Sequence, residues 1–234
     1  MKNENHRRDF LKTTLALGAV TAIPGMSLLS ACKEKEGEEK EVSPPEDLMQ
    51  EHGLLNRVLL IYDFCKVKTV NKESFSVEQL SNAASIVKTF VEDYHENQEE
   101  NYLFPRFQKA NQLTDLVDIL LKQHKAGRNI TEQIIKLTKQ QTRTDSENQT
   151  LISLLTSFNT MYRPHEARED TVLFPAFRKL VSRHEYDSLG EEFENNEHKI
   201  FGEDGFETMV EKVSTIEKQL GIYELSQFTP SNRE

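Results

Sequence analysis

The sequence of 234 residues contains no tryptophan, two cysteines, nine glycines and seven prolines. Two cysteines cannot form a disulfide framework, and so little glycine and proline excludes collagen-like and proline-rich scaffolds. No glycine-rich motif indicates a nucleotide pocket. The 29 lysines and arginines are outnumbered by 39 acidic residues, which gives a formal net charge of -10. This charge would repel a phosphate backbone, so we expect no nucleic-acid partner.

Long uninterrupted apolar runs are also missing, although a short one lies near the N-terminus. Over positions 1–32, a polar, basic start is followed by an apolar stretch from about Leu15 and by small residues before a cysteine, which is the organisation of an export signal. A membrane-spanning helix is the alternative. Gly18, Pro24 and Gly25 interrupt a run that is already shorter than the roughly 18 apolar residues a span requires.

Two short motifs specify the kind of export signal. Arg7-Arg8 resembles a twin-arginine signal, and the tetrapeptide that ends at Cys32, Leu-Ser-Ala-Cys, resembles a bacterial lipoprotein cleavage box. These resemblances imply an exported lipoprotein, anchored in a membrane through lipid on Cys32 and facing the periplasm or the cell exterior. Residues 33–45 are rich in charge and are predicted to form a solvated tether.

Apolar residues recur at helical spacing in four later segments, and each stripe includes a histidine. The first stripe, for example, is Leu48, His52, Leu55, Leu59, Tyr62. Strand-like alternation is missing, so the pattern predicts an all-α protein with an up-down four-helix bundle over residues 46–182. We expect an extra C-terminal helical segment over residues 183–221, broken near Gly202 to Gly205 and packed outside the bundle, and a loose tail over 222–234.

Capping motifs predict where helices begin. Ser43 and Glu46 form a capping box with proline at the first helical position, and similar signals start at Ser76 and Ser146. Cys65, the second of the two cysteines, is predicted to be a small buried residue on the first helix.

An internal repeat is the strongest signal in the chain. The segment from His95 to Pro105 matches the segment from His165 to Pro175, and both read His-x-x-x-Glu-x-x-x-Leu-Phe-Pro. His52 precedes the first of these segments by nearly the same spacing as His124 precedes the second. Each half of the bundle therefore has one helix with a single histidine and one helix with a histidine and a glutamate.

Residues four apart lie one above the other on a helix, so His95 and Glu99 can present a nitrogen and a carboxylate to one point. His165 and Glu169 can do the same from a facing helix. Buried carboxylates require a cation, and the inner stripes contain no lysine or arginine. A single core histidine is more often structural, but four at corresponding depths favour a metal site. The predicted metal ligands are His52, His95, Glu99, His124, His165 and Glu169.

Imidazole and carboxylate together suit iron, zinc, manganese or copper better than calcium. The two glutamates could bridge two divalent ions. The Leu-Phe-Pro tripeptides are predicted to pack beyond the ligands, with the proline bending or ending each helix.

These spaced motifs resemble the hemerythrin-like HHE cation-binding family over about residues 46–182. The resemblance implies an oxygen-bridged non-haem centre of two iron ions, held by the six residues above and bridged by Glu99 and Glu169. It also implies a small ligand such as O2, NO or peroxide, which the protein would bind or sense. With only two carboxylates at the site, iron storage is less favoured than in bundles with four.

The sequence departs from oxygen-carrying hemerythrins at Arg128, where those proteins have another histidine. Water, Glu51, Glu96 or His198 could fill the vacated position. Alternative functions are a di-iron enzyme that reduces peroxide or NO or repairs iron centres, and a structural bundle stapled by metal. No catalytic residue is identifiable, because core packing is the simpler role for the tyrosines near the predicted site, Tyr62, Tyr94, Tyr102 and Tyr162.

Overall fold

The computed structural model describes residues 43–140 and 142–230 of the chain. The export signal, the cleavage box at Cys32 and most of the predicted tether lie outside these residues. All regular elements in the described ranges are helical, which confirms the all-α prediction. Within the same ranges, no helix combines the length and the apolar character needed to cross a membrane.

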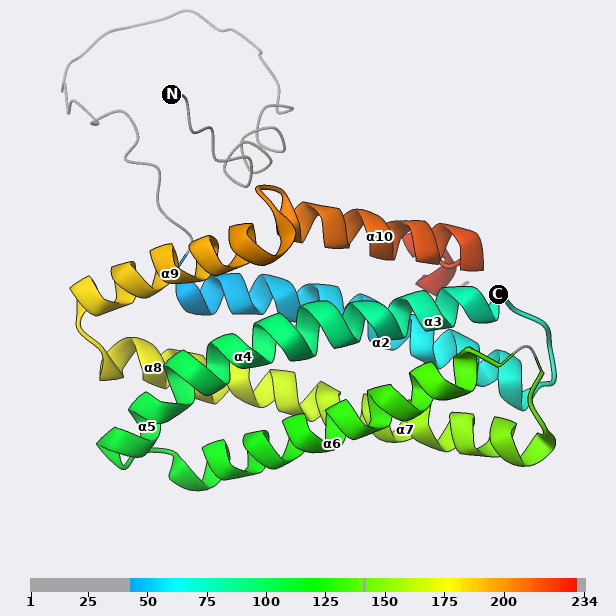
Figure 1. The fold of residues 1–234 in the computed structure, drawn as a ribbon, viewed down its shortest axis with the longest axis horizontal. Coiled ribbons are helices and arrows are strands. Elements are labelled where there is room, and N and C mark those ends of the chain that lie inside the picture. The colour runs from blue at the N-terminus through cyan, green and yellow to red at the C-terminus, as the bar shows by residue number, and fades with distance from the viewer. Residues whose placement is uncertain (1–42, 141, 231–234) are drawn as a thin grey trace, which may run out of the picture.

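Four antiparallel rods form the bundle (Figure 1). The first rod is the single helix α2 and the third is the single helix α6, whereas the second and fourth are each divided by π-helical turns. In chain order the elements are α2 (Pro44–Val70); α3 (Val77–Ile86), η1 (Val87–His95), α4 (Glu96–Gln98), η2 (Glu99–Leu103) and α5 (Phe104–Ala110); α6 (Thr114–Thr138); and α7 (Asp145–Arg168), η3 (Glu169–Leu173) and α8 (Phe174–Leu180).

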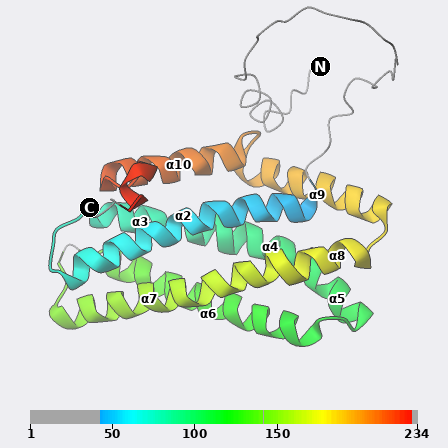
Figure 2. The same cartoon turned by 180° about the vertical axis from the view of Figure 1, so that it is seen from behind.

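The C-terminal segment forms two helices outside the bundle, α9 (Arg183–Phe201) and α10 (Gly205–Leu220). The break between them includes Gly202, whose φ of 89° favours glycine. Both views show α9 and α10 lying over the α2 and α3 side of the bundle, opposite α6 (Figures 1 and 2). The predicted loose tail differs in part from the structure, because it contains a short 3₁₀ helix, η4 (Leu225–Phe228).

The predicted helix starts are correct for the first and second rods and wrong for the fourth. At the start of α2, the backbone N–H of Ser43 donates to the Glu46 carboxylate at 3.2 Å. Ser76 is the N-cap residue of α3, although its side chain makes no capping hydrogen bond. At α7, however, the cap is Thr144 and not Ser146, which already lies inside the helix. The Glu147 N–H donates to the Thr144 hydroxyl at 3.2 Å, and the Thr144 N–H donates to the Glu147 carboxylate at 2.7 Å. The glutamate three residues after the cap therefore fixes the start.

The Leu-Phe-Pro tripeptides produce π turns. The Phe104 N–H bonds to the carbonyl of Glu99, five residues back, and the Phe174 N–H bonds to that of Glu169. The next residue in each segment is a proline, which has no N–H for the α-helical bond. The rods therefore do not end at the prolines, but continue as α5 and α8 after one wide turn.

Two apolar clusters fill the bundle, one on each side of the predicted metal ligands along the rods. The larger is built around Tyr62, Phe90 and Phe158, and the smaller around Phe107 and Phe177. Cys65 is completely buried in the larger cluster, as predicted. The predicted ligands thus occupy a polar layer enclosed by apolar side chains, where electrostatic interactions are stronger than in water.

Candidate metal centre

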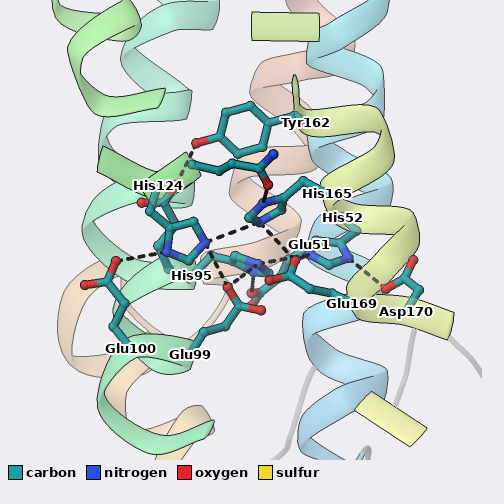
Figure 3. Close-up of polar contacts among 12 residues, drawn as sticks. Glu51, His52, His95, Glu99, Glu100, His124, Tyr162, His165, Glu169 and Asp170 are labelled. Atoms are coloured by element: carbon teal, nitrogen blue, oxygen red, sulfur yellow. Dashed lines mark hydrogen bonds and ion pairs between the residues drawn. The ribbon is translucent and has the colours of Figure 1, made fainter. Parts of the chain in front are cut away.

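The six predicted ligands meet at the centre of the bundle (Figure 3). Each is at most 4% exposed. They come from all four rods, in the arrangement that the repeat predicts: His52 on α2, His95 and Glu99 at η1 and η2, His124 on α6, and His165 and Glu169 at α7 and η3.

The histidines form two pairs, each joining the two rods of one half. His52 Nε2 lies 3.1 Å from His95 Nε2. His124 Nε2 lies 3.3 Å from His165 Nε2. In each pair, the two Nε2 atoms therefore point toward one shared position. Each half therefore supplies one pair of nitrogen donors.

The two glutamates lie between these pairs. Glu169 Oε2 is 3.1 Å from His165 Nε2 and 3.5 Å from His52 Nε2. Glu99 Oε2 is 3.5 Å from His124 Nε2 and 3.8 Å from His95 Nε2. Each carboxylate thus faces one histidine from each half. Two groups of potential donors share Glu99, and within each group the donor atoms lie within 4.8 Å of one another. Their composition is that of two adjacent metal subsites.

The outer nitrogen of every one of these histidines faces an oxygen acceptor. A carboxylate accepts only, so the Nδ1 atom beside it carries the proton and Nε2 keeps its lone pair. The acceptors are Asp170 for His52 at 2.8 Å, Glu51 for His95 at 2.7 Å, Glu100 for His124 at 2.9 Å and the amide oxygen of Gln123 for His165 at 2.9 Å. Such partners orient histidine ligands and increase their basicity.

Apart from the contact between Glu99 and Glu169 themselves, no hydrogen bond reaches their four carboxylate oxygens from the residues that the structure describes. The nearest side-chain nitrogens are the Nε2 atoms, whose lone pairs point inward. Two buried carboxylates without donors are costly, and a cation between them satisfies both. The donor set therefore fits a pair of divalent metal ions.

Burial sets the protonation states of these residues. It raises the pKa of Glu99 well above its usual value, and the neighbouring Glu169 raises it further. Burial likewise raises the pKa of Glu169. It lowers the pKa of His165 to about 4 and that of His95 well below its usual value. The imidazoles of His95 and His165 are thus neutral at pH 7, as ligation requires, and a bound metal would displace the protons of the two carboxyl groups.

Phenylalanines from the π turns stack on two of the histidines. Phe174 stacks on His52 and Phe104 stacks on His124, each with ring centroids 5.6 Å apart. The wide turns thus bring the aromatic ring of each Leu-Phe-Pro motif directly against a ligand of the other half. The motif packs against the site, as predicted.

Among the proposed substitutes for the missing histidine, only Glu96 shares a potential metal group of the described residues with an inner residue, His124. Arg128 lies 2.7 Å from both Glu96 and Glu100. Glu96 also accepts a hydrogen bond from the Tyr162 hydroxyl at 2.7 Å. Glu51 is held by His95, and His198 on α9 belongs to none of the potential metal groups found among the described residues. Arg128 therefore compensates two outer carboxylates and does not supply a nitrogen donor where the oxygen carriers have a histidine.

Sequence reasoning missed the outer acceptors and the Tyr162 hydrogen bond. The repeat contained the signal for the acceptors, because each is next in sequence to a predicted ligand and at the same place in both halves. Glu51 directly precedes His52 as Gln123 precedes His124, and Glu100 follows Glu99 as Asp170 follows Glu169. No pattern in the sequence indicates that Tyr162 bonds to Glu96, since the two residues are distant in the chain.

The fold and this geometry define a helical-bundle protein with a buried metal-type site. A family model, the hemerythrin HHE cation binding domain, matches residues 43–177, and the chain belongs to that family. A second model, the signal sequence of the twin-arginine translocation pathway, matches residues 4–24. The chain is therefore a metal-binding type of bundle with a signal for export across a membrane.

Similar proteins occur in mycobacteria. An uncharacterized protein of Mycobacterium tuberculosis strain H37Rv and one of Mycobacterium bovis are each 44% identical to this chain over 195 residues. The similarity covers 83% of this chain and 76% of each relative. No solved structure matches the chain significantly.

Proposed function

We propose that this exported protein holds a non-haem di-iron centre and binds or senses O2 or a related small oxidant such as NO or peroxide. The metal ligands are His52, His95, Glu99, His124, His165 and Glu169. The observation that supports this most strongly is the pair of buried carboxylates, Glu99 and Glu169. No other residue in the described part of the chain donates a hydrogen bond to them, and they lie between two pairs of inward-facing imidazole nitrogens.

The number of donors supports a reactive centre over a purely structural one. Each subsite has two imidazoles and shares the two carboxylates, which is fewer protein donors than octahedral iron accepts. Two imidazoles with a carboxylate and open positions are typical of non-haem iron sites that react with oxygen. When bound, the iron ions would supply a redox-active position for a small ligand. The protein's residues would hold that position in a buried polar layer enclosed by two apolar clusters.

Rapid mixing of the anaerobic, reduced, iron-loaded protein with O2, NO and peroxide tests this function. Binding or sensing predicts an optical change that reverses when the ligand is removed. A zinc-loaded sample is the control, because zinc has no redox chemistry and should give no change. An iron-loaded protein that shows no spectral response to any of the three ligands would leave only a structural role for the metal.

A di-iron enzyme is the second candidate, and one observation favours it. The Tyr162 hydroxyl donates to Glu96, which also pairs with Arg128, and the tyrosine ring lies 5.3 Å from the His165 ring. A buried phenol that close to the site could supply a proton or an electron. Repeated turnover of peroxide or NO with an added reductant would favour the enzyme, whereas one reversible binding event favours the sensor.

We propose further that Cys32 carries a lipid anchor, which places the bundle at a membrane, facing the periplasm or the cell exterior. The twin-arginine match over residues 4–24 and the lipoprotein-like box that ends at Cys32 support this. Phase partitioning with a detergent should place the mature protein in the detergent phase. The Cys32→Ala variant should remain in the aqueous phase, and equal partitioning of both proteins would contradict the anchor.

A further inference from the structure

The two halves of the bundle present equivalent faces beside His95 and His165, but only one is covered. Tyr94 directly precedes His95 as Pro164 precedes His165, and Asp47 precedes His52 by the same spacing as Ile119 precedes His124. Tyr94 is 2% exposed and Asp47 is 6% exposed, whereas Ile119 is 51% exposed and Pro164 is exposed. The duplicated centre therefore has one closed side and one open side.

The C-terminal helices close the first face. Asn196 of α9 donates to the Gln98 amide oxygen at 3.2 Å, and Phe201 at the end of α9 packs edge-on against Tyr94 with ring centroids 5.4 Å apart. The residual space beside His52 and His95 has no room for a water molecule. The space next to His52 and His95 is thus too small for a small molecule, and α9 packs over Tyr94 beside it.

A groove of about 410 Å³ marks the second face, between α6 and α7. Its lining comprises Asp115, Leu116, Ile119, Leu120, Gln123, Pro164, His165 and Arg168. His165 is the one member of the inner group of six that contributes to this lining. Gln123, the hydrogen-bond partner of His165, also lines the groove. Gln123 is neutral, whereas Glu51, the equivalent partner of His95 on the closed side, is acidic.

We propose that small uncharged diatomic molecules reach the metal centre through this groove, next to His165, while α9 and α10 block the equivalent route next to His95. Four of the eight lining residues are aliphatic, and the two charged residues among them, Asp115 and Arg168, have opposite signs. Such a passage offers no net attraction to ions and suits an apolar ligand. The inference rests on the proposed function, because it presumes a metal centre at which the ligand arrives.

A tryptophan in the groove tests the route. Ile119→Trp should fill the groove, and Val67→Trp on α2 is the matched control because Val67 is also 51% exposed. With the reduced, iron-loaded proteins and NO as the probe, stopped-flow absorbance should give a combination rate about tenfold lower for Ile119→Trp than for Val67→Trp. The equilibrium affinity for NO should be equal in both, since the ligands themselves are unchanged.

A second readout shows where the new indole lies without using NO. The natural chain has no tryptophan, so each variant has a single emitting indole. Position 119 is about 8 Å along α6 from His124, whereas position 67 is about 22 Å along α2 from His52. Co²⁺ added to the metal-free proteins should therefore quench the fluorescence of Ile119→Trp strongly and that of Val67→Trp weakly.

The two readouts together decide the question. Strong quenching with an unchanged NO rate would overturn the route, because the indole then occupies the groove without slowing the ligand. If the quenching of Ile119→Trp is weak, its indole points to solvent, and Leu116→Trp replaces it with the same two outcomes. A natural protein that takes up neither iron nor Co²⁺ would overturn the proposed function itself, which distinguishes that failure from a failure of the route alone.

Discussion

The first half of the bundle, α2 to α5, and the second half, α6 to α8, have the same inner residues but different outer ones. In both halves a histidine pair and a glutamate face the centre, and the two Nε2 atoms of each pair are 3.1 and 3.3 Å apart. Around them the halves diverge: His95 donates to the carboxylate of Glu51, whereas His165 donates to the amide of Gln123. The inner duplication supports the proposed pair of metal subsites, and the outer differences would make these subsites chemically unequal.

A second difference concerns the buried glutamates that follow His95 and His165. Glu96 pairs with Arg128 and Tyr162, whereas its equivalent, Glu166, accepts a hydrogen bond from the neutral amide of Asn56. Burial raises the pKa of Glu166 to about 8, since the nearby Asp170 adds to the effect and Asn56 only partly opposes it. Thus a close ion pair with Arg128 compensates Glu96 in one half, whereas Glu166 in the other half has the neutral amide of Asn56 as its hydrogen-bond partner.

The inner equivalence predicts the largest effect. Glu99→Gln and Glu169→Gln should each weaken Co²⁺ binding by more than about 100-fold, because an inner ligand contributes more than the 10- to 100-fold attributed to outer partners. The two losses should be similar, since each carboxylate faces one histidine from each half. Isothermal titration of the metal-free proteins measures both affinities. Losses that differ by more than about tenfold would show that the glutamates are not shared equally between the subsites.

The difference between the outer acceptors Glu51 and Gln123 predicts smaller changes in metal affinity, of opposite sign for the two substitutions. Glu51→Gln should weaken metal binding by about 10- to 100-fold, because the basicity of His95 falls when its acceptor loses its charge. Gln123→Glu should instead strengthen binding at the His165 subsite. Competition with a coloured chelator measures both changes. Gln112→Glu, at an exposed position, is the control for added charge, and an equal gain in that variant would assign the effect to general electrostatics.

Much of this centre could be predicted from the sequence because helix geometry and an internal repeat act together. Four histidine-containing stripes and the spacing of His95 and Glu99 placed all six inner residues correctly at one centre. The π turns after Glu99 and Glu169 were not predictable from periodicity, since a wide turn changes the hydrogen bonding without breaking the apolar stripe. The covering of one face by α9 depends on tertiary packing, which no local pattern encodes.

The Tyr162 hydrogen bond predicts a moderate effect on folding. Tyr162→Phe should lower the free energy of unfolding of the metal-free protein by about 1–2 kcal/mol, because the buried Glu96 loses a donor. Urea denaturation measures this change. Tyr102→Phe is the matched control, because its hydroxyl donates to Glu192 at the surface, 3.1 Å away, and should contribute much less. Equal effects in the two variants would contradict a special role for the buried bond.

The smallest predicted effect depends on pH and concerns Glu92, which corresponds to Tyr162 in the internal repeat. Burial raises the pKa of Glu92, and Thr131 and Lys88 oppose this only in part. The folded state then holds a proton more tightly than the unfolded state, so this contribution to stability is present at low pH and is lost as the pH rises through the folded pKa. Glu92→Gln should therefore be more stable than the natural protein at pH 8, by about 1 kcal/mol. This advantage in the free energy of unfolding should be smaller at pH 5.

Urea denaturation of the metal-free proteins at the two pH values measures this difference. Glu78→Gln, at an exposed position on α3, is the control and should show no such dependence on pH. A Glu92→Gln variant whose advantage is the same at pH 5 and pH 8 would show that burial does not perturb this carboxyl group.

Metal analysis combined with Mössbauer spectroscopy of the aerobically purified, iron-grown protein tests the central claim most directly. We predict about two iron ions per chain, both non-haem and both lost together in the Glu99→Gln/Glu169→Gln variant. A single iron, a zinc ion, or an iron content that this double variant leaves unchanged would contradict the assignment of the six buried residues to a di-iron centre.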